Sequence, residues 1–165
     1  MKVSILMGSP SDLPKMKGAA IALKQFGVAW EARVMSAHRS PAVVESYVRE
    51  APKNGVRIFI CGAGLAAHLA GCVAGQTHLP VIGVPLSSGG LNGQDALFST
   101  VQMPKGVPVA TVAIDGAFNA GLLAVQMLAL SDEKLTAELL AWKKSQEEAV
   151  LEADKKAQET IAETF

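Results

Sequence analysis

Three chemically useful side chains stand together between Ser36 and Pro41 (SAHRSP). Ser36 supplies a hydroxyl, Arg39 a guanidinium, and His38 an imidazole, the side-chain type that changes charge near neutral pH. The stretch follows an alternating apolar run and precedes a helix-like segment, whose first N–H groups and dipole would favour an anion. We therefore expect an anionic substrate and proton transfer by His38. The alternative is structural, with Arg39 in a salt bridge and His38 capping the helix.

A second polar segment, Gly8 to Asp12 (GSPSD), separates an apolar run from another helix-like segment. The hydroxyls of Ser9 and Ser11 suit a phosphate, and the carboxylate of Asp12 suits ribose hydroxyls. Such residues also commonly cap helices, so capping is the alternative. The segment is not a P-loop, because no Gly-Lys-Ser/Thr follows it, and it lacks the dinucleotide fingerprint.

Two further loops are rich in glycine and small residues. The first runs from Gly62 to His68 (GAGLAAH), and its small residues predict a close approach of backbone to a planar ligand. A lone histidine is more often structural, so we expect His68 to position other groups rather than to catalyse. The second loop, Pro85 to Gly93 (PLSSGGLNG), contains Ser88.

Each of these loops follows a predicted strand. The expected strands are Val3–Met7, Ala29–Val34, Val56–Cys61, Val81–Val84 and Val107–Ile114, and helix-like segments alternate with them. Such alternation predicts right-handed βαβ units and a parallel sheet. We expect a three-layer, doubly wound α/β fold of flavodoxin or Rossmann type. The loops would then meet at the carboxyl edge of the sheet, where such folds bind ligands.

The composition restricts the class of function. The 165 residues are 50% hydrophobic and 18% charged with zero formal net charge, which argues against a nucleic-acid surface. Cys61 and Cys72 lack metal-ligand spacing and are expected to be buried thiols. No apolar run reaches the roughly 18 residues of a membrane span, and no leader pattern precedes the first strand, so we expect a cytoplasmic protein.

The composition changes at residue 131. Residues 132–165 contain no Gly or Pro, which predicts a long helix, with Ser131 as its N-cap. A narrow apolar stripe follows this helix: Leu135, Leu139, Trp142, Ala149, Ala153 and Ala157. The stripe either lies on its own domain or packs on a neighbouring subunit. We expect a catalytic α/β domain over residues 1–130 and a C-terminal helical arm over residues 131–165.

Several motifs in order resemble one family, that of the catalytic subunit of phosphoribosylaminoimidazole carboxylase, and within it the bacterial mutase branch. The motifs are M-G-S-x-S-D at Met7–Asp12, S-A-H-R-T-P at Ser36–Pro41 with Ser40 replacing Thr, G-A-G-x-A-A-H-L-x-G at Gly62–Gly71, L-P-V-x-G-V-P at Leu79–Pro85 and S-x-V-Q-M-P-x-G-x-P-V at Ser99–Val109. The resemblance covers about residues 2–130. Leu65 and Ala70 stand where the family usually has Gly and Pro, which leaves the exact path of the presumed base-binding loop open.

The resemblance implies an activity. Members of this branch convert N5-carboxyaminoimidazole ribonucleotide to 4-carboxy-5-aminoimidazole ribonucleotide in de novo purine (IMP) biosynthesis, without ATP, metal or organic cofactor. It also implies a homo-octamer, supplied with substrate by an ATP-dependent carboxyaminoimidazole ribonucleotide synthetase.

The resemblance likewise implies roles for the residues singled out above. His38 would be the general acid and base. The substrate would be held by Ser9, Ser11, Ser36 and Arg39 at the phosphate, Asp12 at the ribose, and Gly64, His68 and Ser88 around the base.

Two other functions remain open from the sequence. One is a direct carboxylase that combines aminoimidazole ribonucleotide with free carbon dioxide; Arg39 and His68 favour the mutase over it by family pattern. The other is a nucleotide-binding module without activity, because a fold does not fix a function.

Overall fold

The computed structural model describes residues 1–164, apart from the side chain of residue 163. The chain contains two compact units, Met1–Val125 and a C-terminal unit that begins at Gln126. The first unit contains the sheet and every polar loop discussed above. No helix among the described residues is long and apolar enough to cross a membrane.

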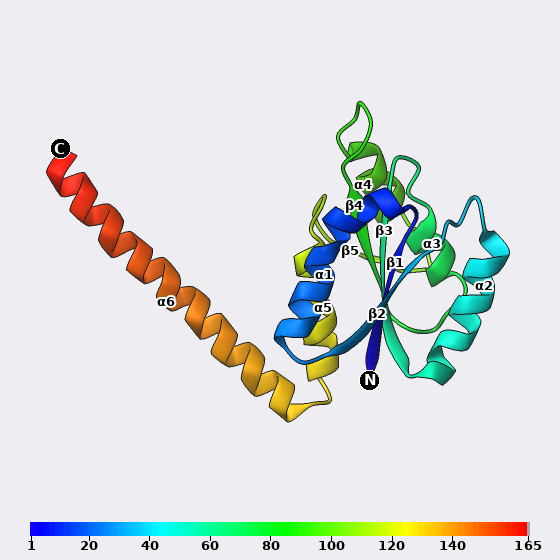
Figure 1. Ribbon diagram of the computed structural model, residues 1–165, viewed down its shortest axis with the longest axis horizontal. Coiled ribbons are helices and arrows are strands. Elements are labelled where there is room, and N and C mark those ends of the chain that lie inside the picture. The colour runs from blue at the N-terminus through cyan, green and yellow to red at the C-terminus, as the bar shows by residue number, and fades with distance from the viewer. Residues whose placement is uncertain (165) are drawn as a thin grey trace. The chain divides into compact units, whose positions relative to one another are not determined.

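The first unit is built on a five-stranded parallel sheet in the order β2-β1-β3-β4-β5 (Figure 1). The strands are β1 (Lys2–Met7), β2 (Ala29–Val34), β3 (Val56–Gly64), β4 (Val81–Leu86) and β5 (Ala110–Thr111). This is the flavodoxin-like order, in which the chain reverses direction across the sheet between β1 and β3. The predicted doubly wound α/β fold is confirmed. β2, which contains the charged residues Glu31 and Arg33, lies at an edge.

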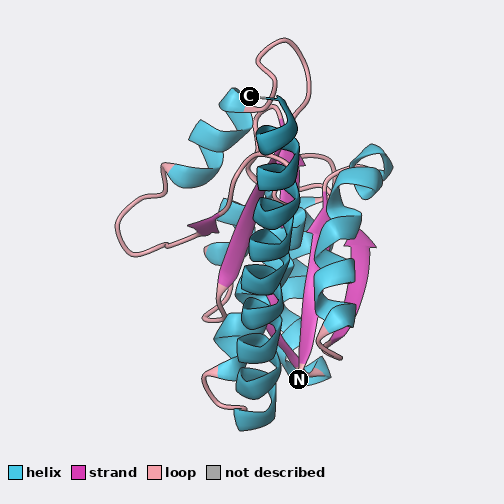
Figure 2. Ribbon diagram, turned by 90° about the vertical axis from the view of Figure 1, so that its left-hand side faces the viewer, coloured by secondary structure: helices cyan, strands magenta, loops and turns pink. Residues whose placement is uncertain are grey.

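Helices cover both faces of this sheet (Figures 1 and 2). They are α1 (Leu13–Gln25), α2 (Pro41–Glu50), α3 (Leu69–Ala74), α4 (Gln94–Val101) and α5 (Ala117–Ala129), with short 3-10 turns at Pro10–Asp12 and Ala51–Asn54. Glycines in the strands let these helices approach closely. A Cβ at Gly62 would overlap Met16 of α1, and a Cβ at Gly83 would overlap Thr100 of α4.

Four strands differ in length from the prediction: β1 begins one residue earlier, at Lys2, β4 ends two residues later, at Leu86, and β3 and β5 differ more. β3 continues to Gly64, because it is central and pairs with β1 on one side and with β4 on the other. β5 contains only two residues, instead of the expected Val107–Ile114. It is an edge strand that pairs with β4 alone. Pro108 just before it has no N–H to donate to a ladder.

The C-terminal unit contains one long helix, α6 (Glu133–Thr164). Its N-cap is Asp132, whose carboxylate accepts a hydrogen bond from the Leu135 N–H at 3.0 Å. The prediction of Ser131 as N-cap is wrong, because the Ser131 hydroxyl donates to the Leu128 carbonyl instead.

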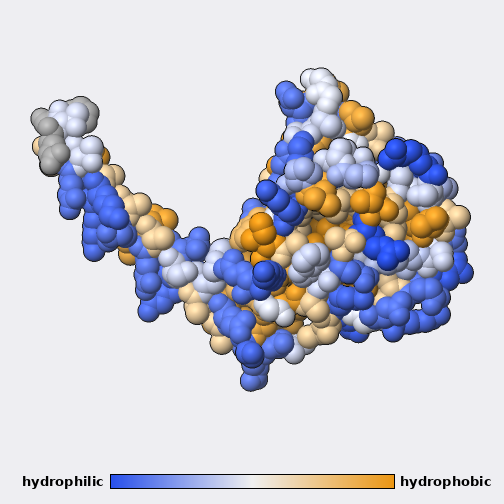
Figure 3. Space-filling view, viewed as in Figure 1, coloured by the Kyte–Doolittle hydropathy of each residue, from blue (hydrophilic) through white to orange (hydrophobic). Residues whose placement is uncertain are grey.

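The predicted apolar stripe of α6 differs in exposure along its length. Leu135 and Leu139 are buried and Trp142 is half-buried, whereas Ala149, Ala153 and Ala157 are exposed. In Figure 3 polar and apolar side chains lie along different sides of this helix. Its outer part therefore carries an apolar strip that is open to solvent in the single chain.

The two cysteines differ in exposure to solvent. Cys61 on β3 is buried as expected, and burial raises the pKa of its thiol. The prediction for Cys72 is wrong, because that residue is exposed on the outer side of the short helix α3. Both are free thiols.

Candidate active site

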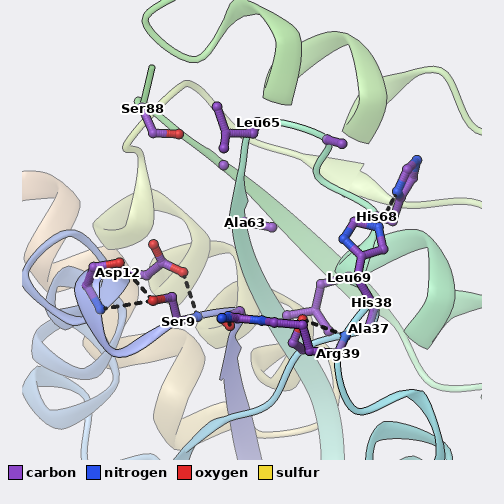
Figure 4. A pocket seen from close by; sticks show the side chains of 15 residues that line it. Ser9, Asp12, Ala37, His38, Arg39, Ala63, Leu65, His68, Leu69 and Ser88 are labelled. Carbon is purple, nitrogen blue, oxygen red and sulfur yellow. Dashed lines mark hydrogen bonds between the residues drawn. The ribbon is translucent and has the colours of Figure 1, made fainter.

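A pocket of about 390 Å³ lies at the carboxyl edge of the sheet, within the size range of small-molecule sites (Figure 4). Its lining comes from the segments that follow β1, β2, β3 and β4. All nine residues predicted for the site line it: Ser9, Ser11, Asp12, Ser36, His38, Arg39, Gly64, His68 and Ser88. The sequence prediction that these loops converge on one site is therefore confirmed.

Two histidines from different loops meet in this pocket. The His38 Nε2 lies 2.6 Å from the His68 Nδ1, and the two rings are nearly perpendicular, at 81°. In this hydrogen bond one of the two nitrogens carries the hydrogen and donates it, and the other accepts. Both side chains are exposed to the pocket. The arrangement can therefore give or take a proton at a bound molecule.

Arg39 connects the second loop to the first. Its Nη2 donates to the Gly8 carbonyl at 2.8 Å, which carries the guanidinium across the sheet edge toward the loop after β1. Its backbone N–H donates to the Ser36 Oγ at 3.2 Å, in a tight turn before α2. The turn is closed by the Ser40 hydroxyl, which donates to the Ser36 carbonyl at 3.0 Å.

The loop after β1 is a capping box. The Ser9 N–H donates to the Asp12 carboxylate at 3.0 Å, and the Ser9 Oγ accepts from the Ser11 N–H and hydroxyl. The capping alternative is confirmed, and the same residues also line the pocket, so their binding of a phosphate and a ribose stays a prediction. Burial raises the pKa of Asp12 above its usual value, although backbone hydrogen bonds and nearby cations oppose the shift.

The loop after β4 closes over the end of β3. A Cβ at Gly64 would overlap the Ser88 Oγ, so the missing side chain allows Ser88 to approach β3 in this way. Of the loop Gly62–His68, five residues line the pocket: Ala63, Gly64, Leu65, Ala66 and His68. From the loop Pro85–Gly93 only Ser88 does so, because the loop turns away at Gly89, where φ is +62°.

A charged cluster, not predicted from the sequence, fixes the start of the loop after β4. The Lys15 ammonium on α1 donates to the Ser87 hydroxyl at 2.6 Å and to its carbonyl, and it lies 3.7 Å from the Asp115 carboxylate. The Ser87 N–H donates to the same carboxylate at 2.9 Å. The pKa of Asp115 is lower than its usual value. Partial burial acts in the opposite direction, but the hydrogen bonds from Ser87 and the charge of Lys15 outweigh it. Its position after the last strand is the sequence signal that could have identified Asp115 as a residue near the site.

Among the described residues no group of three or more His, Cys, Asp and Glu side chains is placed to hold a metal ion. The polar groups of the pocket are hydroxyls, backbone N–H groups, one guanidinium and the two imidazoles. These groups suit an anionic organic ligand and proton transfer.

The fold and the pocket together define a flavodoxin-like α/β protein whose pocket brings hydroxyls, a guanidinium and two imidazoles together. A family model described as AIR carboxylase matches residues 2–149, and the chain belongs to this family. The chain is 52% identical over 153 residues to the N5-carboxyaminoimidazole ribonucleotide mutase of Vibrio parahaemolyticus, covering 92% of this chain and 95% of the relative. It is 50% identical to the mutase of Thermotoga maritima, with 92% and 88% covered.

Two further similarities extend this comparison. The chloroplastic phosphoribosylaminoimidazole carboxylase of Vigna aconitifolia is 51% identical over 93% of this chain, but the match covers 28% of that longer protein. A crystal structure of Treponema denticola PurE superposes with a TM-score of 0.86 at 31% identity, and covers 94% of this chain and 97% of that one. The likeness therefore extends over nearly the whole chain in sequence and in fold.

Proposed function

We propose that this chain is an N5-carboxyaminoimidazole ribonucleotide mutase, which forms 4-carboxy-5-aminoimidazole ribonucleotide for purine (IMP) biosynthesis. Membership of the family and the names of relatives at about 50% identity support the reaction. The observation that carries the proposal is the contact of His38 with His68, at 2.6 Å, inside a pocket with anion-binding groups. That contact supplies the proton transfer that the isomerisation needs.

The loops after β1 and β2 would hold the ribonucleotide. Ser9, Ser11 and Ser36 offer hydroxyls, and Arg39 offers a planar fork of donors that suits a phosphate. Asp12, beside them, would accept hydrogen bonds from the ribose hydroxyls. The aminoimidazole would then extend toward Gly64, Ser88 and the two histidines, which line the rest of the pocket.

His38 would act as acid and then as base. The N–C bond of the carbamate breaks, carbon dioxide is released, and the exocyclic nitrogen takes up one proton. Ring carbon four of the resulting aminoimidazole, an enamine carbon, attacks the carbon dioxide and then loses its proton. One proton goes in and one comes out, so a single acid–base group completes the cycle, and His68 holds its ring in place.

An assay of the purified protein tests this proposal. One sample receives N5-carboxyaminoimidazole ribonucleotide, and a second receives aminoimidazole ribonucleotide with bicarbonate, both without ATP or added metal. We expect fast formation of the carbon-carboxylated product in the first sample. Turnover in the second sample alone would instead establish a direct carboxylase, and product in neither would leave a nucleotide-binding module.

The assembly and cellular setting belong to the same proposal. We expect a cytoplasmic homo-octamer of catalytic domains over residues 1–130, whose arms over residues 131–165 pack on neighbouring subunits. The apolar strip on the outer part of α6 supports a partner for the arm. An ATP-dependent carboxyaminoimidazole ribonucleotide synthetase would supply the substrate, because a labile carbamate must be made by a preceding, energy-consuming step.

A further inference from the structure

The helix α4 contributes a hydroxyl that contacts the pocket loops without lining the pocket. Ser99 on this helix is half-buried and is not one of the lining residues. Its hydroxyl donates to the Asp95 carbonyl of the same helix at 2.7 Å, which leaves the lone pairs of the oxygen to accept. The Ala67 N–H donates to this oxygen at 3.2 Å. Ser99 therefore ties α4 to the backbone of the segment that connects β3 to α3.

The connecting segment is the one that carries His68. It leaves the sheet after Gly64, and residues 65–68 belong to neither a strand nor a helix. The His68 N–H donates to the Ala66 carbonyl at 3.0 Å, which is a local bond within the turn. The hydrogen bond from Ala67, the residue before His68, reaches another element instead. It therefore fixes where the turn lies, and with it the backbone from which the His68 ring extends.

A second contact from the same stretch of chain lies on the other side of His68. Met103 follows α4, and a Cβ at Gly71 on α3 would lie 3.1 Å from its sulfur, so the thioether packs against the backbone of this short helix. Ala67 and Gly71 flank His68 in the sequence, and the chain from Ser99 to Met103 contacts both of them. His68 thus lies between two contacts with one other part of the fold.

The position of His68 matters for the proposed function, on which this inference rests. Its Nδ1 lies 2.6 Å from the His38 Nε2, and Figure 4 shows the two rings together at the pocket. A hydrogen bond between side chains of different loops forms only when both backbones are in place. A shift of about 1 Å in a group that orients a reacting residue can cost about 10²-fold in rate. Whatever holds the turn before His68 therefore contributes to turnover.

We propose that Ser99 is a positioning residue for the acid–base pair, because its hydroxyl accepts the Ala67 N–H and so holds the turn that keeps His68 against His38. Ser99 does not line the pocket, so it acts through the backbone of this turn. Its loss should lower kcat and leave KM nearly unchanged, because the groups proposed to hold the phosphate and the ribose come from the loops after β1 and β2.

Steady-state kinetics of the full chain with N5-carboxyaminoimidazole ribonucleotide measure this effect. Ser99→Ala removes the acceptor, and we expect kcat to fall about fivefold, the factor that corresponds to one typical hydrogen bond. Ser99→Thr keeps a hydroxyl at the same place on the helix and should restore kcat. Ser145→Ala is the matched control, because the Ser145 hydroxyl also donates to a carbonyl of its own helix, that of Trp142 at 2.7 Å, but belongs to the C-terminal unit. Its kcat should equal that of the wild type.

A double-mutant cycle separates positioning from a general effect on folding. If Ser99 acts through His68, then Ser99→Ala lowers kcat in the wild type but changes it little in the His68→Asn background, because the ring that it positions is already gone. A role in the stability of the fold alone would lower kcat by the same factor in both backgrounds. Equal factors would therefore overturn the inference, as would a wild-type kcat in Ser99→Ala.

A spectroscopic measurement tests the same positioning without turnover. NMR spectra of 15N-labelled histidine side chains, assigned with His38→Asn and His68→Asn, report whether the His38 Nε2 is hydrogen-bonded. In Ser99→Ala we expect this signal to move toward its position in His68→Asn, whereas Ser99→Thr should leave it as in the wild type. An unchanged signal in Ser99→Ala would contradict the positioning role even if kcat falls. If the wild type forms no product from the carbamate at all, the proposed function fails, and the spectra still decide whether Ser99 holds the histidine pair together.

Discussion

At the scale of single residues, the histidine pair gives the sharpest prediction. His38→Asn keeps a polar side chain of similar reach but removes the titrating ring, so we expect turnover to fall by about 10²- to 10⁴-fold, the usual contribution of a positioned acid–base group. The residues proposed to hold the phosphate remain, and nucleotide binding should therefore stay within a few fold of the wild type. Steady-state kinetics and calorimetric titration with aminoimidazole ribonucleotide measure the two effects.

His68→Asn is the companion variant of this pair. It removes the ring that holds the His38 Nε2 at 2.6 Å but leaves His38 itself. Turnover should fall less than in His38→Asn, because the acid–base group is still present but poorly oriented. Full activity of His38→Asn would remove His38 from the mechanism, and a larger loss in His68→Asn would exchange the two roles.

Residue types and spacing predicted the members of the pocket well. Hydroxyls, His38 and Arg39 follow strands directly, and parallel strands bring such positions to one edge. The contact of His38 with His68 could not be predicted, since it depends on side-chain directions across 30 residues of chain. Lys15 was missed for a similar reason, because nothing in a helix sequence shows which lysine reaches a distant loop.

At the scale of elements, the Lys15 cluster anchors the loop that carries Ser88. Lys15→Met removes the ammonium from Ser87 and Asp115, which frees the base of this loop. We expect KM to rise about fivefold, the equivalent of about 1 kcal/mol, with little change in kcat, because the proposed acid–base residues are untouched. Lys17→Met, an exposed lysine of the same helix, is the control. Equal KM values for the two variants would contradict the anchoring role.

A buried polar network joins β1, β2 and α2. The fully buried Ser4 hydroxyl lies 2.6 Å from the Tyr47 hydroxyl, which donates to Glu31, and Glu31 in turn accepts from Lys2 at 2.8 Å. Burial and the bond to Glu31 raise the pKa of Tyr47 to about 12, so the phenol stays protonated and keeps its donor at ordinary pH.

Tyr47→Phe leaves the Ser4 hydroxyl buried without this partner. We expect the free energy of unfolding to fall by about 1–3 kcal/mol, the cost of an unsatisfied buried group. Because the second change then removes a group that is already unpaired, the double variant Ser4→Ala/Tyr47→Phe should lose less than the sum of the two single losses. Urea titrations give the four stabilities, and strictly additive losses would show that the two hydroxyls do not interact.

The ends of an element could be predicted where a residue of that element itself determines them. The predicted helix after the Ser36–Pro41 segment is α2, and it begins at Pro41, where a proline at the first position has no N–H to lose. The lengths of β3 and β5 were wrong, because pairing on one or two sides decides where a strand ends. That information lies in the neighbours of a strand and is absent from its own residues.

At the scale of the whole molecule, the exposed outer part of α6 predicts how chains associate. Leu140, Val150, Leu151 and Ile161 are apolar and between 46% and 69% exposed. Exposed apolar residues gathered on one long helix are typical of a surface that another chain covers. The i,i+4 ion pairs Lys144–Glu148 and Glu152–Lys156 stabilise the same helix, so it can stay helical without a partner chain.

Removal of residues 144–165 tests whether this surface holds the assembly together. The sheet and pocket lie within Met1–Val125, so the shortened chain should keep its α/β circular dichroism spectrum. Light scattering should give the full chain a native mass eight times 17.2 kDa, and the shortened chain a smaller assembly. Matched substitution of Leu151 and Ile161 by Gln in the full chain should reduce the mass in the same direction, because it removes the apolar contact but keeps the length. An unchanged octamer in both variants would mean that the contacts between chains come from the α/β unit, and that the arm has another partner.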